Sequence, residues 1–114
     1  MDDDAAIRKL LSNLLKQKGY LIATARDGFE AGQKVGEFKP DLIILELFMP
    51  GIDGFEVCQR IKRNPKTAHI KIAVHTGNHT PKNQDRIIKA GADEYLIKPI
   101  ERRALFQVAA KLIG

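Results

Sequence analysis

The sequence predicts an α/β protein in which a parallel β-sheet lies between two layers of helices, a three-layer α/β/α arrangement. Short apolar, β-branched runs alternate with amphipathic segments along the chain, and this alternation is typical of parallel sheets. The run 41–46 is continuously apolar before an acid closes it, as in strands that helices cover on both faces. Because 114 residues are fewer than a typical domain of about 150, we expect one domain over 1–114.

The first half of the chain is expected to form a helix over 5–18, a strand over 20–25, a helix over 28–38 and a strand over 41–46. Apolar residues recur at helical spacing in the first segment, with Asp4 suited to cap it and Gly19 to end it. The second segment is short and β-branched, as strands are. The second helix must end before Pro40, which disfavours a helical residue ahead of it.

The second half is expected to form a helix over 55–64, a strand over 70–75, a helix over 81–90, a strand over 95–97 and a helix over 101–113. The Pro-Gly and Asp-Gly pairs between residues 50 and 54 mark a loop ahead of the first of these. Pro65 stops that helix, Pro81 suits the first turn of the next, and Gly91 ends it. The strands are therefore expected to be parallel, with right-handed crossovers.

Composition narrows the possible functions. The net charge is +5, but the basic residues are spread along the chain, with no zinc-finger spacing and no aromatic RNA-binding pattern, so nucleic-acid binding is not expected. No apolar run reaches the roughly 18 residues that cross a membrane, and the acidic amino terminus is unlike a signal peptide. A single cysteine, Cys58, fits a reducing, cytoplasmic setting and is expected to pack in the core.

Chemically active side chains follow the ends of the predicted strands. Glu46, Thr76 and Lys98 stand at three such ends, and an acidic cluster with Asp2 and Asp3 precedes the first helix. Functional groups of parallel sheets collect at this edge. Carboxylates there could hold Mg²⁺, and the lysine and hydroxyl could hold phosphoryl oxygens. The set describes a phosphoryl-acceptor pocket better than a hydrolase, so we do not expect an enzyme.

Two stretches resemble the receiver domain of bacterial response regulators, as in chemotaxis response regulators and other two-component proteins. One is Pro-Asp-Leu-Ile-Ile-Leu-Glu-Leu-Phe-Met-Pro-Gly-Ile-Asp-Gly-Phe-Glu-Val over 40–57; the other is Ala-Gly-Ala-Asp-Glu-Tyr-Leu-Ile-Lys-Pro over 90–99. Thr76 lies between them at the family's spacing. The resemblance implies a flavodoxin-like fold, a phosphorelay function, and a histidine kinase or phosphotransfer protein as the phosphoryl donor.

The resemblance also implies the residues of a Mg²⁺ site. Asp2 and Asp3 match the acidic pair, with Asp3 favoured as the direct ligand. Glu46 stands at the phospho-acceptor position, and the backbone carbonyl of Phe48 matches a further ligand.

Four more positions match the family's switch. Thr76 corresponds to the hydroxyl that senses the phosphoryl group, and Tyr95 to the aromatic that changes rotamer on activation. Lys98 corresponds to the lysine that pairs with the phosphoryl group, and Pro99 follows it in what is usually a cis peptide.

Glu46 departs from the family, which carries an aspartate there. The extra methylene moves the carboxylate by about 1.5 Å, and errors near 1 Å cost on the order of a hundredfold in rate. We therefore expect phosphorylation to be weak or absent. Glu46 could form a plain ion pair with Lys98, imitate the phosphorylated state by reaching Thr76 and Lys98, or still accept a phosphoryl group with a weakened Mg²⁺ site.

A second departure is that the family's first, central strand, which precedes the acidic pair, is missing. Its loss is expected to leave the strands 20–25 and 41–46 with unpaired edges and to place Asp2 and Asp3 on a loosely held terminus. An artificially shortened chain or a mis-assigned start, a natural truncation that closes its own sheet, and a self-associating form all remain open. We favour self-association of an atypical stand-alone receiver that acts through protein–protein contacts.

His75 is unexpected inside an apolar strand. We expect a hydrogen bond to satisfy its ring, and a pH-sensitive role beside the pocket is the alternative.

Overall fold

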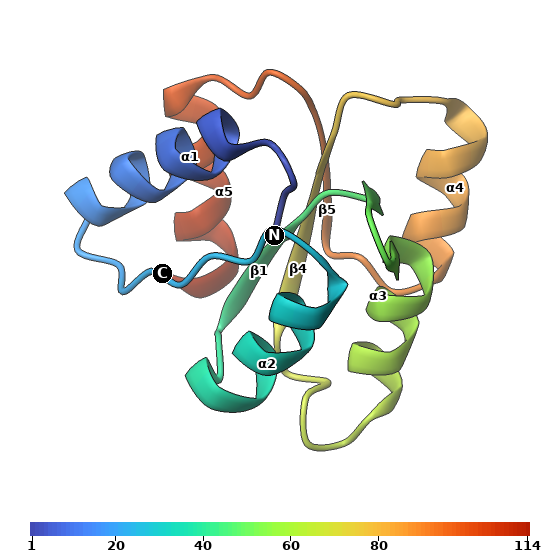
Figure 1. Ribbon diagram of the computed structural model, residues 1–114. Helices are drawn as coiled ribbons and strands as arrows, with labels where there is room; N and C mark the ends of the chain where they lie inside the picture. The colour runs from blue at the N-terminus through green and yellow to red at the C-terminus, as the bar shows by residue number, and fades with distance from the viewer.

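The computed structural model describes residues 1–114 (Figure 1). Its helices and strands follow the predicted order, except that no strand separates the first two helices and a short hairpin follows the first strand. The helices are α1 (Ala5–Gln17), α2 (Gly28–Phe38), α3 (Gly54–Arg63), α4 (Pro81–Lys89) and α5 (Arg102–Ile113). The strands are β1 (Leu42–Leu45), β2 (Phe48–Met49), β3 (Ile52–Asp53), β4 (Lys71–Thr76) and β5 (Glu94–Ile97). No helix has the length and apolar character that crossing a membrane requires.

The main sheet is parallel and has the order β1-β4-β5. Helices α1 and α5 lie on one face and α3 and α4 on the other (Figure 1). This is the predicted three-layer α/β/α arrangement, with β4 in the middle of the paired strands. The carboxyl ends of the three strands consequently meet at one edge, which is where the chemically active residues were expected.

Four helices begin at a residue whose side-chain oxygen accepts hydrogen bonds from the first turn. Asp4 caps α1 as predicted, and Asp27, Asp53 and Thr80 cap α2, α3 and α4. Each such cap satisfies backbone N–H groups that have no partner within the helix. The helix boundaries in the sequence are therefore set mainly by these short polar residues and by Pro81 in the first turn of α4.

Two apolar clusters hold the layers together. The larger packs β1 and β4 against α3 and α4, with Cys58, Ile72 and Val74 fully buried. The smaller lies on the other face, where Leu11 and Leu15 of α1 meet α5. Cys58 is thus a core residue, as expected, and burial raises the pKa of its thiol to about 11.

The predicted strand over 20–25 is not a strand in the structure. The segment belongs to no sheet and faces β1 across a groove that both line. No backbone group of residues 21–24 has a hydrogen-bond partner in the chain. The sequence favours an extended conformation here, but no neighbouring strand is present with which this segment could form a ladder.

The predicted loop over 50–54 contains a short antiparallel hairpin of β2 and β3. Gly51 turns it with φ at +69°, in the left-handed region that glycine adopts without strain. Gly54 follows, and a Cβ there would lie 2.7 Å from the Leu47 Cα. The absence of a side chain at Gly54 therefore lets α3 start directly against the loop that follows β1, close to Glu46.

Candidate functional site

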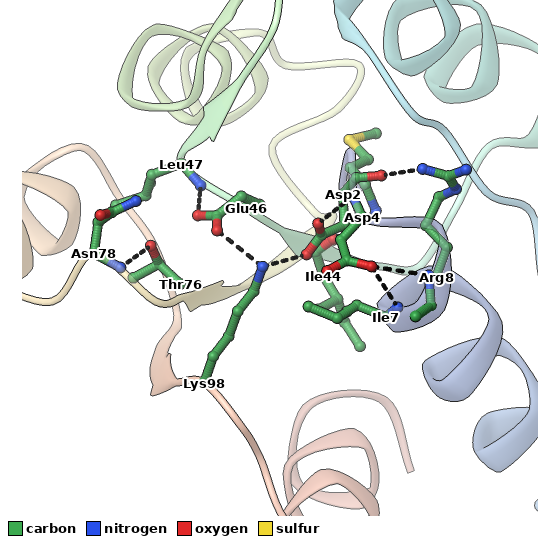
Figure 2. Close-up of polar contacts among 12 residues, drawn as sticks. Asp2, Asp4, Ile7, Arg8, Ile44, Glu46, Leu47, Thr76, Asn78 and Lys98 are labelled. Carbon is green, nitrogen blue, oxygen red and sulfur yellow. Dashed lines mark hydrogen bonds and ion pairs between the residues drawn. The ribbon is translucent and has the colours of Figure 1, made fainter.

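The carboxyl edge of the sheet brings Glu46, Thr76 and Lys98 together from three segments (Figure 2). Glu46 follows β1, Thr76 ends β4, and Lys98 follows β5. Asp2 joins them from the start of the chain. The side chains of Asp2, Glu46 and Thr76 are almost completely buried, so their interactions with one another are only weakly screened by water.

Lys98 lies between the two buried carboxylates. Its Nζ is 2.7 Å from an Asp2 oxygen and 2.9 Å from Glu46 Oε1. The other Glu46 oxygen accepts a 2.6 Å hydrogen bond from the Leu47 N–H. Burial alone would lower the pKa of Lys98, but hydrogen bonds to Asp2 and Glu46 and their charges outweigh it and raise the pKa. The lysine is therefore held as a cation, and both Glu46 oxygens have a partner.

Asp2 is held more firmly than expected for a residue at a terminus. Its N–H donates to the Ala25 carbonyl at 3.0 Å, and Arg8 donates to its carbonyl oxygen at 2.8 Å. Its second carboxylate oxygen accepts from the Asp4 N–H at 2.9 Å. Asp3, by contrast, is exposed. The expectation that both acids lie on a loose terminus is thus wrong for Asp2, because three hydrogen bonds and the ion pair with Lys98 hold it.

The side chains at the two switch positions, Thr76 and Tyr95, bond to residues other than Glu46. The Thr76 hydroxyl accepts from the Asn78 N–H at 3.1 Å and makes no hydrogen bond to Glu46. The Tyr95 hydroxyl lies 3.0 Å from His79 Nδ1. Burial, and secondarily the charge of Glu46, raises the pKa of Tyr95. The peptide between Lys98 and Pro99 is cis.

Two of the carboxylates that the resemblance assigns to Mg²⁺, those of Asp2 and Glu46, are paired with a lysine in this arrangement. No group of three His, Cys, Asp or Glu side chains converges as metal ligands would. The Lys98 ammonium instead bridges Asp2 and Glu46, while Phe48 lies in β2 with its side chain half exposed. A divalent cation bound to both carboxylates would have to displace this ammonium.

His75 contradicts its prediction. The residue is only 3% exposed, yet neither ring nitrogen has a hydrogen-bond partner. Burial lowers the pKa of the imidazole, and the nearby Lys98 charge lowers it further, against the opposing charges of Asp2 and Glu46. The ring is therefore kept neutral beside the cluster.

Sequence reasoning missed three groups around the site. Arg8, the Leu47 N–H and His79 each bond to a residue that the sequence had singled out. A backbone N–H gives no sequence signal. Arg8 lies near the start of α1 and His79 in the loop between β4 and α4, and basic residues at such places are ordinarily read as solvated.

The fold and the edge together define a class of protein. A parallel α/β/α sheet presents one carboxylate position, one lysine and one hydroxyl from three adjacent segments, which is the arrangement of a phosphoryl-responsive signalling domain. The model of the response regulator receiver domain matches residues 1–110, and the chain belongs to this family. Receiver domains are signalling modules of two-component systems.

Individual relatives agree. The chain is 39% identical to the transcriptional regulatory protein AfsQ1 of Streptomyces coelicolor, over 92% of this chain and 45% of that protein. It is also 39% identical to the transcriptional regulatory protein ResD of Bacillus subtilis, over 98% of this chain and 46% of that protein. The chain thus spans about half the length of these curated relatives.

Solved structures show the same fold. A signal receiver domain of a DNA-binding response regulator from Colwellia psychrerythraea is 35% identical, with a TM-score of 0.93 over 98% of this chain and 93% of that chain. The chemotaxis protein CheY4 of Vibrio cholerae is 28% identical, with a TM-score of 0.88 over 98% of this chain and 93% of that chain. The flavodoxin-like fold expected from the resemblance is confirmed.

Proposed function

We propose that this chain is an atypical receiver that is phosphorylated poorly or not at all and acts through protein–protein contacts. The observation that carries this proposal is the state of Glu46. One Glu46 oxygen pairs with Lys98, and the other accepts a hydrogen bond from the Leu47 N–H. Neither oxygen is therefore free to attack a phosphoryl donor. The longer side chain also places the carboxylate about one bond length away from where an aspartate would hold it.

Constitutive imitation of the phosphorylated state has less support. Such imitation would need Glu46 to engage the hydroxyl of Thr76, which instead bonds to Asn78. The aromatic switch residue Tyr95 is bonded to His79. The pocket therefore fits a resting arrangement in which Lys98 is neutralised within the chain. A histidine kinase or phosphotransfer protein is the partner class that this proposal inherits from the family.

The test is phosphorylation by acetyl phosphate with Mg²⁺, followed by intact-mass spectrometry. We expect the wild-type chain to stay unmodified, and Glu46→Asp to gain one phosphoryl group because its shorter side chain restores the geometry. Glu46→Gln is the matched control, since it keeps the length but removes the nucleophilic carboxylate. Rapid labelling of wild-type Glu46 would overturn the proposal.

A folded Glu46→Asp variant that stays unlabelled would show that the geometry of Glu46 is not the only obstacle. In that case the pairing of Lys98 with Asp2, or the open edge beside β1, would also prevent phosphorylation. Far-ultraviolet circular dichroism of both variants establishes that they are folded before the comparison is made.

A further inference from the structure

Positive charge is concentrated at the amino end of the main sheet, opposite to the edge that holds Glu46. Residues 60–71 form the end of α3, the loop to β4 (yellow-green, at the bottom of Figure 1) and the first residue of β4. They include five lysines and arginines and no acid, and none of the 14 aspartates and glutamates of the chain lies between 57 and 84. The charge of this segment is therefore not offset by its neighbours in the sequence.

Only two of these five cations form an ion pair in the structure. Arg60 pairs with Glu56 at 2.6 Å, and Lys62 pairs with Asp93 at 2.8 Å. The three free cations, which have no acid within salt-bridge distance, are Arg63, Lys66 and Lys71. The first two are exposed and the third is half-buried, so all three are accessible to a molecule that approaches this end of the sheet.

The dipole of α3 explains only part of this charge. Arg60, Lys62 and Arg63 lie in the last turn of the helix, where cations are favoured by the partial negative charge of the carbonyl end. Lys66 and Lys71 lie beyond the helix, and the dipole effect falls off within one turn. The positive charge thus continues along the loop to the start of β4, where stabilisation of α3 gives no reason for it.

The loop that carries the free cations is held in one conformation by its own hydrogen bonds. The Lys66 N–H donates to Asn64 Oδ1 at 2.9 Å, and the Thr67 hydroxyl donates to the Ile61 carbonyl at 2.8 Å. At its far end, Lys62 Nζ donates to the Ile70 carbonyl at 2.6 Å. A surface that is already ordered loses less conformational entropy when a partner binds.

We propose that the three free cations form a docking surface for an acidic segment of a partner protein. Carboxylates of such a segment would supply the negative charge that the chain itself lacks between 57 and 84, and complementary charge speeds and orients association. The surface lies at the opposite end of the sheet from Glu46. The proposal therefore goes beyond the proposed function and holds whether or not Glu46 accepts a phosphoryl group.

A nucleic acid is a poorer partner for this surface. No Phe, Trp or Tyr lies between 56 and 94, so the segment offers no ring on which the bases of a single strand could stack. Proteins that bind duplex DNA typically neutralise about six to ten phosphates, and three free cations are too few for this. A short run of carboxylates matches their number better.

The probe is a fluorescein-labelled peptide, Gly-Glu-Glu-Asp-Glu-Glu-Gly, titrated with the full chain and followed by fluorescence anisotropy. We expect saturable binding that weakens as salt rises from about 20 to 200 mM, because salt screens exposed charges. Combining Arg63→Glu, Lys66→Glu and Lys71→Glu should weaken binding at least about tenfold. The matching glutamine triple variant adds no repulsion and should still weaken binding, which keeps the test valid if the glutamate variant does not fold.

The control variant combines Lys9→Glu, Lys82→Glu and Arg103→Glu. These three cations are exposed and belong to α1, α4 and α5, so the net charge changes equally while the docking surface stays intact. We expect the control to weaken binding by less than about threefold. No saturable binding to the wild-type chain, equal weakening by the two glutamate variants, or tighter binding of a twelve-residue oligothymidylate than of the peptide would each overturn the proposal.

Asp41 provides a test in the opposite direction. It is exposed, and its carbonyl accepts from the Lys71 N–H at 2.9 Å, so it brings a negative charge next to the free cations. Asp41→Asn removes this charge and leaves the backbone bond in place. We expect the peptide to bind about two- to threefold more tightly to this variant at low salt, and an unchanged affinity would contradict a surface that includes Lys71.

Discussion

The two ends of the main sheet each bury a lysine against a carboxylate, but the two lysines are held differently. At the amino end, Lys62 Nζ lies 2.8 Å from Asp93 and donates to the Ile70 carbonyl at 2.6 Å. Asp93 in turn accepts from the Ile72 N–H at 2.8 Å. At the carboxyl end, Lys98 Nζ is within salt-bridge distance of two carboxylates.

The difference separates a structural clamp from an adaptable site. The carboxylates at both ends accept a backbone N–H, but only Lys62 also donates to a backbone carbonyl. Lys62 and Asp93 therefore fasten α3 to the start of β4 and β5. Lys98 at the carboxyl end balances only one of two buried negative charges. A single cation facing two carboxylates can exchange partners, whereas the Lys62 clamp cannot do so without breaking backbone bonds.

The largest expected effect is that of Lys98→Met. It leaves Asp2 and Glu46 buried at 3% and 6% exposure without a cation, which should cost about 3–5 kcal/mol at pH 7. The pKa of Lys98 is raised above its usual 10.5. The contribution of its ion pairs to the free energy of unfolding is therefore fully present below pH 10.5 and is lost as the pH rises through the pKa of Lys98 in the folded chain. Urea unfolding at pH 7 measures the cost.

Lys89→Met is the control for this variant, because its pair with Asp85 is exposed and should contribute less than about 1 kcal/mol. Equal unfolding free energies for the two variants would show that the carboxyl-end cluster is not a buried charge system.

Lys62→Met should cost less, about 1–3 kcal/mol, because Asp93 keeps the Ile72 N–H and is partly exposed. Burial works to raise the pKa of Asp93, but the hydrogen bonds from Lys62 and Ile72 outweigh it and lower the pKa below 3.8. The ion pair of Lys62 and Asp93 therefore contributes to the free energy of unfolding above pH 3.8. This contribution is lost as the pH falls through the pKa of Asp93 in the folded chain. Stability measured from pH 6 downward should decline less steeply in the variant, and an unchanged slope would contradict the clamp.

The smallest effect is a gain. His75→Leu removes two buried nitrogens without partners and should stabilise the chain by about 1 kcal/mol. Because burial and Lys98 lower the pKa of His75 below 6.5, the unfolded chain takes up a proton first, so wild-type stability falls as pH drops below 6.5. The difference in Tm between pH 7.5 and pH 5.5 should be smaller for the variant than for the wild-type chain. Replacing the exposed His69 by leucine should leave that difference unchanged.

The sequence predicted every helix to within a few residues because Asp4, Pro81 and Gly91 are local signals that act within one turn. It also predicted that Glu46, Thr76 and Lys98 meet, since strand ends in a parallel sheet share an edge. It predicted unpaired edges for residues 20–25 but was wrong to assign them a strand, because a strand needs a partner that no local pattern contains. It also missed the isolation of His75, which depends on how the neighbouring layers pack around its ring.

The unpaired stretch 21–24 has a consequence for proteolysis. A protease binds its substrate as an extended chain, and this stretch lies in no helix or sheet, with Leu21 86% exposed and no backbone bonds to break before it can be lifted away. Segments that open at low free-energy cost are the ones cut first. Lys18 and Arg26 flank it and are suitable sites for trypsin, so we expect the first cuts of a limited digestion at these two residues.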